Sequence, residues 1–285
     1  MSQTPAIDSF QASSWHGSLQ LGFARQGQVT QLIHNRAQAP LKVQRPFYPE
    51  GSRVCHAVIL HTAGGMVGGD RLGLDLQLNP HAQALLTTAA AGKVYRSQGL
   101  VAKQSIQIQV AAGACLEWLP QETIVFNGAL YQQDLRVELA PGATWLGWEI
   151  TRLGRTARGE HFLQGSWRSR TEIWQQGSPL WIDSQWLQGG TEMLTSPHGL
   201  AGQPVVATLA WIGPTSPDLV TEARRRWTAV ERQGEAGVTC LSQGLLCRYR
   251  GFATGEARHW FISVWQLLRL CYLQRSACPP RVWQI

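Results

Sequence analysis

Lysine is scarce in this 285-residue sequence, and long blocks of like charge are missing. Only three of the 25 basic residues are lysines, and apart from the triplet Arg224-Arg225-Arg226 the arginines stand singly. The net charge of +7 favours binding to acidic surfaces. No basic tail or nucleic-acid-binding motif accompanies it. We therefore expect an acidic protein, and not nucleic acid, as the partner.

Paired cysteines and long apolar runs are also missing. The six cysteines are scattered without a C-x-x-C pair, which is typical of free thiols in a reducing compartment. No apolar run approaches the roughly 20 residues that cross a bilayer. The start, Met1-Ser2-Gln3-Thr4-Pro5, is polar and unlike an export signal. We expect a cytoplasmic protein that does not enter a membrane.

The motifs of several enzyme classes are absent. The segment Ala89-Ala90-Ala91-Gly92-Lys93-Val94 resembles a phosphate-binding loop, but Thr87 stands where that motif needs glycine and Val94 where it needs Ser or Thr. The glycines at 64–69 do not match a dinucleotide fingerprint, and neither G-x-S-x-G nor H-E-x-x-H occurs. We therefore expect a protein that is not an enzyme.

Alternation of apolar with small or polar residues dominates the chain from about residue 15 to 213. Leucines alternate in this way over 71–78, and isoleucines alternate with glutamines over 105–110. A period of two is typical of half-buried β-strands. Further strands are expected at 54–60, 143–150, 166–174, 179–187 and 204–212. The fold is therefore expected to be mainly β.

Three turns between these strands resemble one another. They are Leu78-Asn79-Pro80-His81-Ala82, Val110-Ala111-Ala112-Gly113-Ala114 and Leu139-Ala140-Pro141-Gly142-Ala143. They recur at intervals of 32 and 29 residues. Self-similarity at such a period indicates stacked β-layers, each covering the exposed face of its neighbour. An ordinary meander or sandwich with similar hairpins fits the pattern equally well.

Helical periodicity replaces the strand pattern near the C-terminus. Asp218 can cap a first helix with an apolar stripe through Trp227. A second helix is expected from about Glu256 to Leu273, and its broad apolar arc suits burial against the strands or a partner. Between the helices, 238–242 and 245–249 predict a hairpin that turns at Gln243-Gly244. No linker is evident, so residues 1–285 are expected to form one domain, with helix, hairpin and helix over about 218–275.

One loop is exceptionally rich in glycine. It reads His61-Thr62-Ala63-Gly64-Gly65-Met66-Val67-Gly68-Gly69-Asp70. Four glycines in six residues allow positive φ angles and close backbone approach. The loop either presents Asp70 to a functional site or is a tight turn that Asp70 caps.

Three acidic residues interrupt apolar strands, namely Glu117, Glu149 and Asp183. An inward charge is costly unless it is paired or faces a wet cavity, whereas an outward charge costs nothing. Both orientations stay open, and several inward acids would form the polar wall of a tunnel. Cys55 and His56 are neighbours on a strand and should point to opposite faces, so no preformed metal site is expected there.

Six sequence strings, in this order and spacing, resemble the UreD (also called UreH) urease accessory proteins over nearly the whole chain. They are Gln44-Arg45-Pro46-Phe47-Tyr48-Pro49-Glu50, the Leu60-His61 and Gly64 to Asp70 segment, Gly92-Lys93-Val94-Tyr95-Arg96-Ser97, Leu116-Glu117-Trp118-Leu119-Pro120-Gln121-Glu122, Leu153-Gly154-Arg155 and Gly159-Glu160-His161-Phe162. The resemblance implies a β-helix-like stack of strands with two helices.

The resemblance also implies a function. Members of the family join a helical protein, UreF, and a GTPase, UreG, and dock on the urease apoprotein, to which nickel travels through a tunnel in the UreD-like subunit. Asp70, Glu149 and Asp183 match acidic tunnel positions. Thr62-Ala63 replaces the common Pro-Pro of the family, and Glu149 and Asp183 each differ by one methylene from the expected acid.

Nickel that moves should meet sparse carboxylates, waters and carbonyls, because thiolate or imidazole cages release metal slowly. The resemblance therefore predicts nickel in transit and no tightly bound cofactor. Two alternatives remain open. One is an enzyme of β-solenoid type with paired carboxylates for acid and base chemistry. The other is an interaction module without a metal route.

Overall fold

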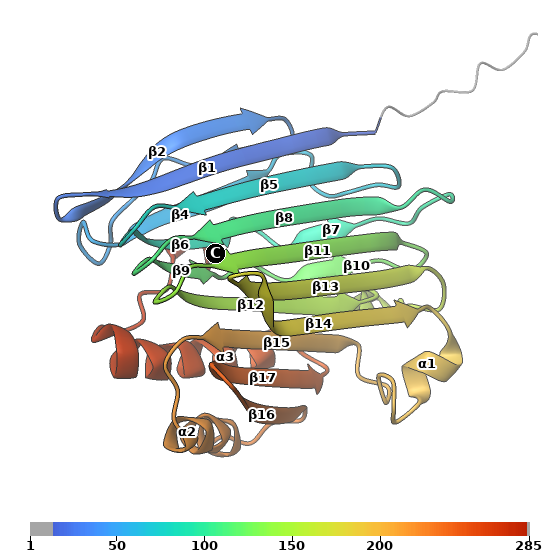
Figure 1. Cartoon of the computed structure of the whole chain (residues 1–285). Coiled ribbons are helices and arrows are strands. Elements are labelled where there is room, and N and C mark those ends of the chain that lie inside the picture. Colours follow the sequence, from blue (N-terminus) through green and yellow to red (C-terminus); the bar gives the residue numbers. More distant parts are fainter. Residues whose placement is uncertain (1–13, 284–285) are drawn as a thin grey trace, which may run out of the picture.

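The chain folds into two facing β-sheets whose strands are added in successive coils (Figure 1). The computed structural model describes residues 14–283; the polar start noted above lies outside this range. Sheet A has the order β14 (Ser178–Gln188), β13 (Ser166–Gln175), β11 (Leu130–Leu139), β8 (Ala102–Val110), β5 (Arg71–Leu78), β1 (His16–Gln26) and β2 (Val29–Gln38). Sheet B has the order β16 (Glu235–Leu241), β17 (Gly244–Gly251), β15 (Val205–Ile212), β12 (Thr144–Leu153), β9 (Cys115–Trp118), β6 (Gln83–Thr88), β4 (Cys55–His61) and β3 (Leu41–Val43). Two short strands, β7 (Gly92–Val94) and β10 (Thr123–Val125), complete it beside β12.

The stacked architecture is confirmed, and the meander alternative is not. Neighbouring strands β5, β8, β11 and β13 are parallel, as are β4, β6, β9 and β12. The three similar turns lie directly above one another, since the Ala111 amide donates to the Leu78 carbonyl and the Ala140 amide to the Val110 carbonyl, both at 2.9 Å. Gly113 has φ +67°, and a Cβ there would lie 2.4 Å from the His81 ring. The stacking therefore requires glycine at that turn.

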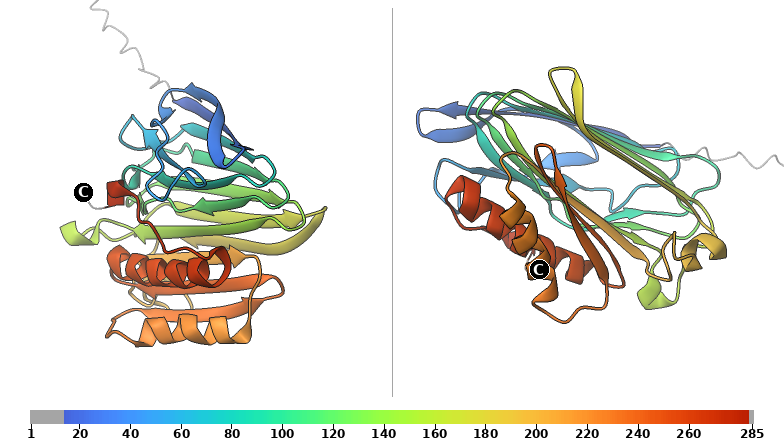
Figure 2. Two further views of the ribbon diagram at one scale, coloured as in Figure 1. Left: turned by 90° about the vertical axis from the view of Figure 1, so that its left-hand side faces the viewer. Right: turned by 60° about the horizontal axis from the view of Figure 1, so that its bottom comes forward.

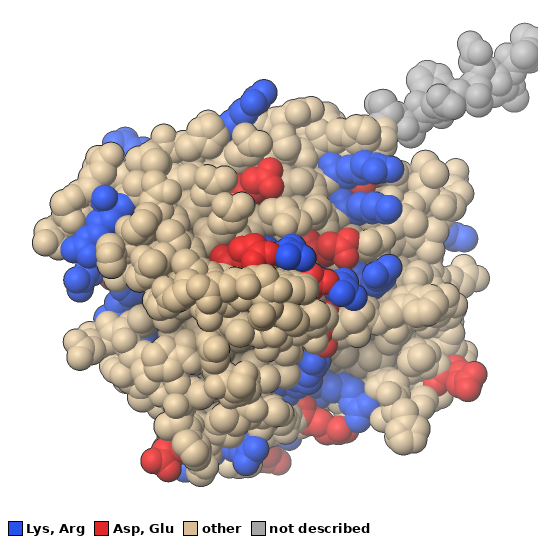
Figure 3. Space-filling view, in the orientation of Figure 1, with Lys and Arg blue, Asp and Glu red and all other residues tan. Residues whose placement is uncertain are grey.

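The main core lies between the two sheets and is built by the alternation seen in the sequence. Along β5 the leucines point inward, where all four are nearly inaccessible to solvent. The outer face of sheet A carries the alternate residues, and acidic and basic side chains lie close together across its middle (Figure 3). Among them, Arg136 pairs with Glu138, and Arg170 pairs with Glu172. This face therefore presents mixed charge and not a patch of one sign.

The two predicted C-terminal helices are present and cover the outer face of sheet B (Figure 2). They are α2 (Pro217–Thr228) and α3 (Thr254–Leu268). Large side chains of α3, including Trp260, Phe261 and Trp265, are buried against the strands. The apolar arc of the last helix is thus covered within the chain itself.

Several details of this region differ from the sequence-based expectations. Ser216 caps α2, because its side chain accepts the amide of Leu219 and Pro217 opens the helix, so Asp218 lies in the first turn. The second helix is α-helical only to Leu268 and continues as a π-helical turn over 269–273. The hairpin turns one residue earlier than predicted, at 242–243. A short helix, α1 (Thr191–Thr195), and 3-10 turns at Thr156–Arg158 and Arg281–Trp283 were not anticipated.

Candidate functional site

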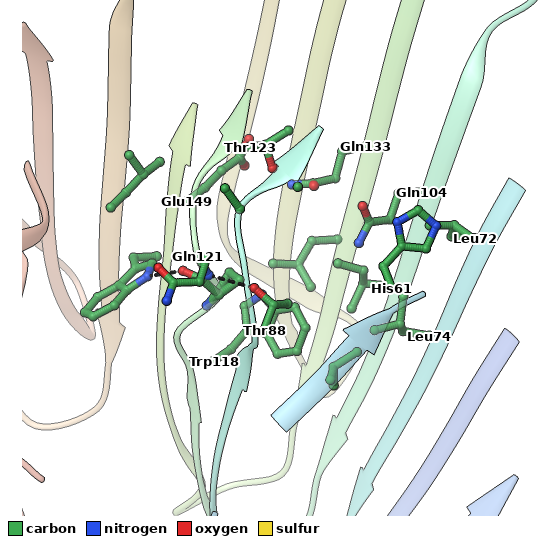
Figure 4. A pocket seen from close by; sticks show the side chains of 18 of the residues that line it. His61, Leu72, Leu74, Thr88, Gln104, Trp118, Gln121, Thr123, Gln133 and Glu149 are labelled. Atoms are coloured by element: carbon green, nitrogen blue, oxygen red, sulfur yellow. Dashed lines mark hydrogen bonds between the residues drawn. The ribbon is translucent and has the colours of Figure 1, made fainter. Parts of the chain in front are cut away.

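A cavity of about 430 Å³ runs between the two sheets across the strands of successive coils (Figure 4). On sheet A its walls come from β5 to β14, and on sheet B from β3 to β15. Its rim includes the glycine-rich loop at Gly64-Gly65 and the segment 89–94. Neighbouring strands are about 4.8 Å apart, so the five strands from β5 to β14 span about 20 Å. The cavity is therefore elongated along the direction of stacking.

A row of polar side chains crosses the inner face of sheet A. Gln104 on β8 is paired with Gln133 on β11, which is paired in turn with Ser169 on β13 and then with Gln185 on β14. The Tyr131 hydroxyl lies 2.9 Å from the side-chain oxygen of Gln104 and 3.0 Å from that of Gln133. All four residues lie at the alternate strand positions that face the other sheet, where apolar residues predominate elsewhere. Polar residues at positions where the alternation calls for apolar ones are the sequence signal that would have revealed the row.

Glu149 projects into the cavity from β12 of sheet B, opposite the polar row (Figure 4). The Ser169 hydroxyl donates to its carboxylate at 2.7 Å and the Thr151 hydroxyl at 3.2 Å. Burial raises the pKa of Glu149, against the effect of these two hydrogen bonds, and the negative charge of Asp183 raises it further. The cavity thus holds a carboxyl group that forms no ion pair with any Lys, Arg or His of residues 14–283.

Asp183 also lines the cavity, from β14 of sheet A. The side-chain amide of Gln185 donates to it at 2.8 Å, and the Arg248 guanidinium lies 2.7 Å from its other oxygen. Only 13% of its side chain is exposed. Two of the three predicted site residues, Glu149 and Asp183, therefore point inward and share one cavity.

Small residues make room beside Glu149. Gly147 lies two residues before it on β12, and a Cβ at Gly147 would lie 2.1 Å from the Trp145 ring. Ala210 and Thr208 face the cavity from the neighbouring strand β15. Any side chain at Gly147 would have to displace the indole of Trp145, which itself forms part of the cavity wall.

Asp70 is buried but is not among the residues that line the cavity. Its two oxygens accept the amides of Trp15 and Val67, each at 2.8 Å. This is the geometry of a carboxylate that fixes the glycine-rich loop and joins it to β1. A function of Asp70 as a nickel contact stays a prediction that nothing in this geometry tests.

His61 is a cavity residue that was not singled out from the sequence as a site residue. Its Nε2 atom is buried without a hydrogen-bond partner in the described part of the chain. Burial lowers the pKa of His61, partly offset by the negative charge of Asp70. Cys55 and His56 point to opposite faces of β4, as predicted. Cys55 packs in the core between the sheets, whereas His56 binds Glu50 on the other face of sheet B.

The remaining strand acid, Glu117, is buried on the outer face of sheet B under α3, away from the cavity.

Within residues 14–283, no group of three or more His, Cys, Asp and Glu side chains is arranged to hold a metal ion. None of the helices described there is long and apolar enough to span a membrane. The cavity thus offers separate polar side chains and not a closed set of metal ligands.

Comparisons with known proteins find relatives along nearly the whole chain. The family model for the UreD urease accessory protein matches residues 16–284. The urease accessory protein UreD of Nostoc sp. is 65% identical over 285 residues, covering 100% of both chains. The proteins of the same name from Trichormus variabilis and Nostoc punctiforme are each 64% identical, over 280 residues (98% of this chain and 99% of the relative) and 275 residues (96% and 98%). The chain therefore belongs to the UreD urease accessory protein family.

Proposed function

We propose that this chain acts in urease maturation as a cytoplasmic scaffold and conduit that carries nickel towards the urease apoprotein. In this proposal it assembles with a helical UreF-like protein and a UreG-like GTPase. The observation that carries it is the elongated cavity, which holds Glu149 and Asp183 together with the polar row across sheet A. A route for a cargo ion needs such a continuous interior path.

The chemistry of the cavity suits a metal ion in transit. Carboxylate, amide and hydroxyl oxygens bind Ni²⁺ more weakly than a set of thiolates or imidazoles would, so an ion can leave each station. Glu149 forms no ion pair within the described part of the chain, and an arriving divalent ion would stabilise its charged form. The imidazole of His61 contributes a single nitrogen at the other end and cannot form a cage alone.

Nucleotide hydrolysis is assigned to the GTPase partner, because the sequence at 87–94 fails the phosphate-loop pattern. The purified chain should therefore hydrolyse neither GTP nor urea. GTPase activity that persists in a preparation free of the partner would overturn this assignment. The enzyme alternative would instead require turnover of some substrate that depends on both Glu149 and Asp183.

Replacement of both cavity acids tests the proposal. In the double variant Glu149→Ala and Asp183→Ala, we expect less nickel in urease while the accessory complex still co-purifies. The matched control is Asp75→Ala and Asp134→Ala, two acids on the outer face of sheet A. The measurements are the nickel content of urease and the partners recovered with each variant.

Each outcome of that experiment has one meaning. Normal nickel content in the cavity variant would remove these acids from the mechanism and favour an interaction module without a metal route. Loss of the complex itself would indicate that the acids are structural. Equal loss of nickel in the control would show that the effect comes from net charge and not from the cavity.

A further inference from the structure

The two sheets end at different strands on the side of the C-terminal hairpin. Sheet A ends at β14, whereas sheet B continues past β15 with β17 and β16, which lie below β14 in Figure 1. Among the described residues, no backbone hydrogen bond joins β14 to β15 or β17. Between β14 and β17 the two sheets therefore meet through side chains and not through a shared strand ladder.

One ion pair spans this opening. Arg248 on β17 reaches across to Asp183 on β14, with 2.7 Å between the guanidinium nitrogen and the carboxylate oxygen. On sheet B, Arg248 continues the cross-strand row that begins at Glu149 and passes through Thr208. The arginine therefore occupies the next position beyond the two cavity acids, on the solvent side of Asp183.

Exposure differs sharply across the pair. The Arg248 side chain is 46% exposed and that of Asp183 only 13%. Asp183 therefore faces the cavity on one side and the guanidinium on the other. A cation that approaches Asp183 from within meets a carboxylate already neutralised by Arg248, and beyond it a fixed positive charge. Because a guanidinium does not lose its proton in proteins, only movement of the side chain removes that charge.

We propose that Arg248 is a gating residue: its ion pair with Asp183 closes this end of the cavity, and a divalent cation passes only when the pair breaks. The inference rests on the proposed nickel route and adds a residue that controls it. A partly solvated pair of this kind is weak, so thermal motion can open it. The flexible stem of arginine lets the charged group swing into solvent without disturbing β17.

Stopped-flow quenching of tryptophan fluorescence by Ni²⁺ tests the proposal on the full chain. Trp118, Trp145 and Trp181 line the cavity and report the arrival of the ion. The variants are Arg248→Gln and Arg248→Met, the second of which keeps an apolar stem. Arg250→Gln is the matched control, because Arg250 lies two residues further on the same strand and forms an equally short pair, 2.7 Å, with Glu235 on β16.

We expect both Arg248 variants to be quenched about two- to fivefold faster than wild type, as the loss of one weak ion pair allows. Arg250→Gln should match wild type. Glu149→Gln should reduce the amplitude of this phase in every background. Thermal midpoints measured on the same samples separate gating from unfolding, because a merely structural change would move the midpoint and not the rate alone.

Three results would contradict the proposal, and they are distinguishable. A phase that depends on Glu149 but has the same rate in wild type and both Arg248 variants would overturn the gate and leave the nickel route standing. A quenching signal that is indifferent to Glu149 in all variants would overturn the route and the gate with it. Faster quenching in Arg250→Gln as well would show that loss of positive charge near β17 is sufficient, and would also overturn the gate.

Discussion

The guanidinium of Arg269 lies 2.5 Å from the carboxylate of Glu117, and neither side chain reaches solvent. Arg269 begins the π-helical turn after α3, and Glu117 lies on β9 of sheet B. The Trp265 indole donates to the same carboxylate at 2.7 Å, and Glu50 accepts from the guanidinium on its other side. This network fixes the C-terminal helix to the sheet whose inner face lines the cavity.

Loss of Arg269 should destabilise the fold strongly. Arg269→Met would leave the buried Glu117 with the more distant guanidinium of Arg275, 3.6 Å away, in place of its direct partner, at a cost of about 3–5 kcal/mol in the free energy of unfolding. Arg225→Met is the control, because its pair with Glu222 on α2 is exposed to solvent and its loss should leave the free energy of unfolding nearly unchanged. Urea denaturation measures both. A loss below 1 kcal/mol in Arg269→Met would show that the network does not anchor the helix.

The same network predicts a loss of stability in acid. Burial alone would raise the pKa of Glu50, but hydrogen bonds from His56 and Arg269 and the charges of Arg269 and Arg275 lower it to about 2. The folded state therefore binds fewer protons than the unfolded state between about pH 4.5 and pH 2. The stabilisation that the Glu50 carboxylate contributes is complete above this range of pH and is lost as the pH falls through it. Unfolding free energies measured from pH 5 to pH 2 should fall less steeply in Glu50→Gln, and parallel curves would contradict this.

Glu149 should show the opposite dependence. Because burial raises the pKa of Glu149 above 4.5, there is a range of pH above 4.5 in which the folded state keeps a proton that the unfolded state has released. The stability of the fold declines as the pH rises through that range. Glu149→Gln should therefore be more stable than wild type at neutral pH, by about 0.5–2 kcal/mol. The difference should shrink as the pH approaches 4.5. Asp75→Asn, on the outer face of sheet A, should show no such gain. Thermal unfolding at several pH values tests both variants.

Asp70 offers a test between its two interpretations. If it mainly fixes the glycine-rich loop, Asp70→Ala leaves the amides of Val67 and Trp15 without an acceptor and costs about 1–3 kcal/mol. Asp70→Asn keeps one acceptor and should lose less. Urea denaturation and the nickel content of urease are measured together. Reduced nickel delivery at unchanged stability in Asp70→Asn would instead support Asp70 as a nickel contact.

The sequence alone determined the class of fold and much of its detail. The period of two predicted β4, β12, β13, β14 and β15 to within a few residues, because alternation records which side of a strand is buried. The repeated turns indicated stacking, and the structure explains why through the contact of Gly113 with His81. The family resemblance was carried by strings that cluster at loops and strand ends, and the comparisons confirm it.

Only the tertiary structure decided which polar residues share a site. Alternation cannot say which of its two faces lies inside, so the strand pattern alone did not distinguish Glu149 and Asp183 from Glu117, and only the family resemblance favoured the first two. Pairing between strands then separated them, placing Glu149 and Asp183 in the cavity and Glu117 under α3. Register also aligned Gln104 with residues of three later strands. The ion pair of Arg248 with Asp183 joins residues 65 positions apart in the sequence. No local pattern can encode it, because it exists only where one sheet ends and the other continues.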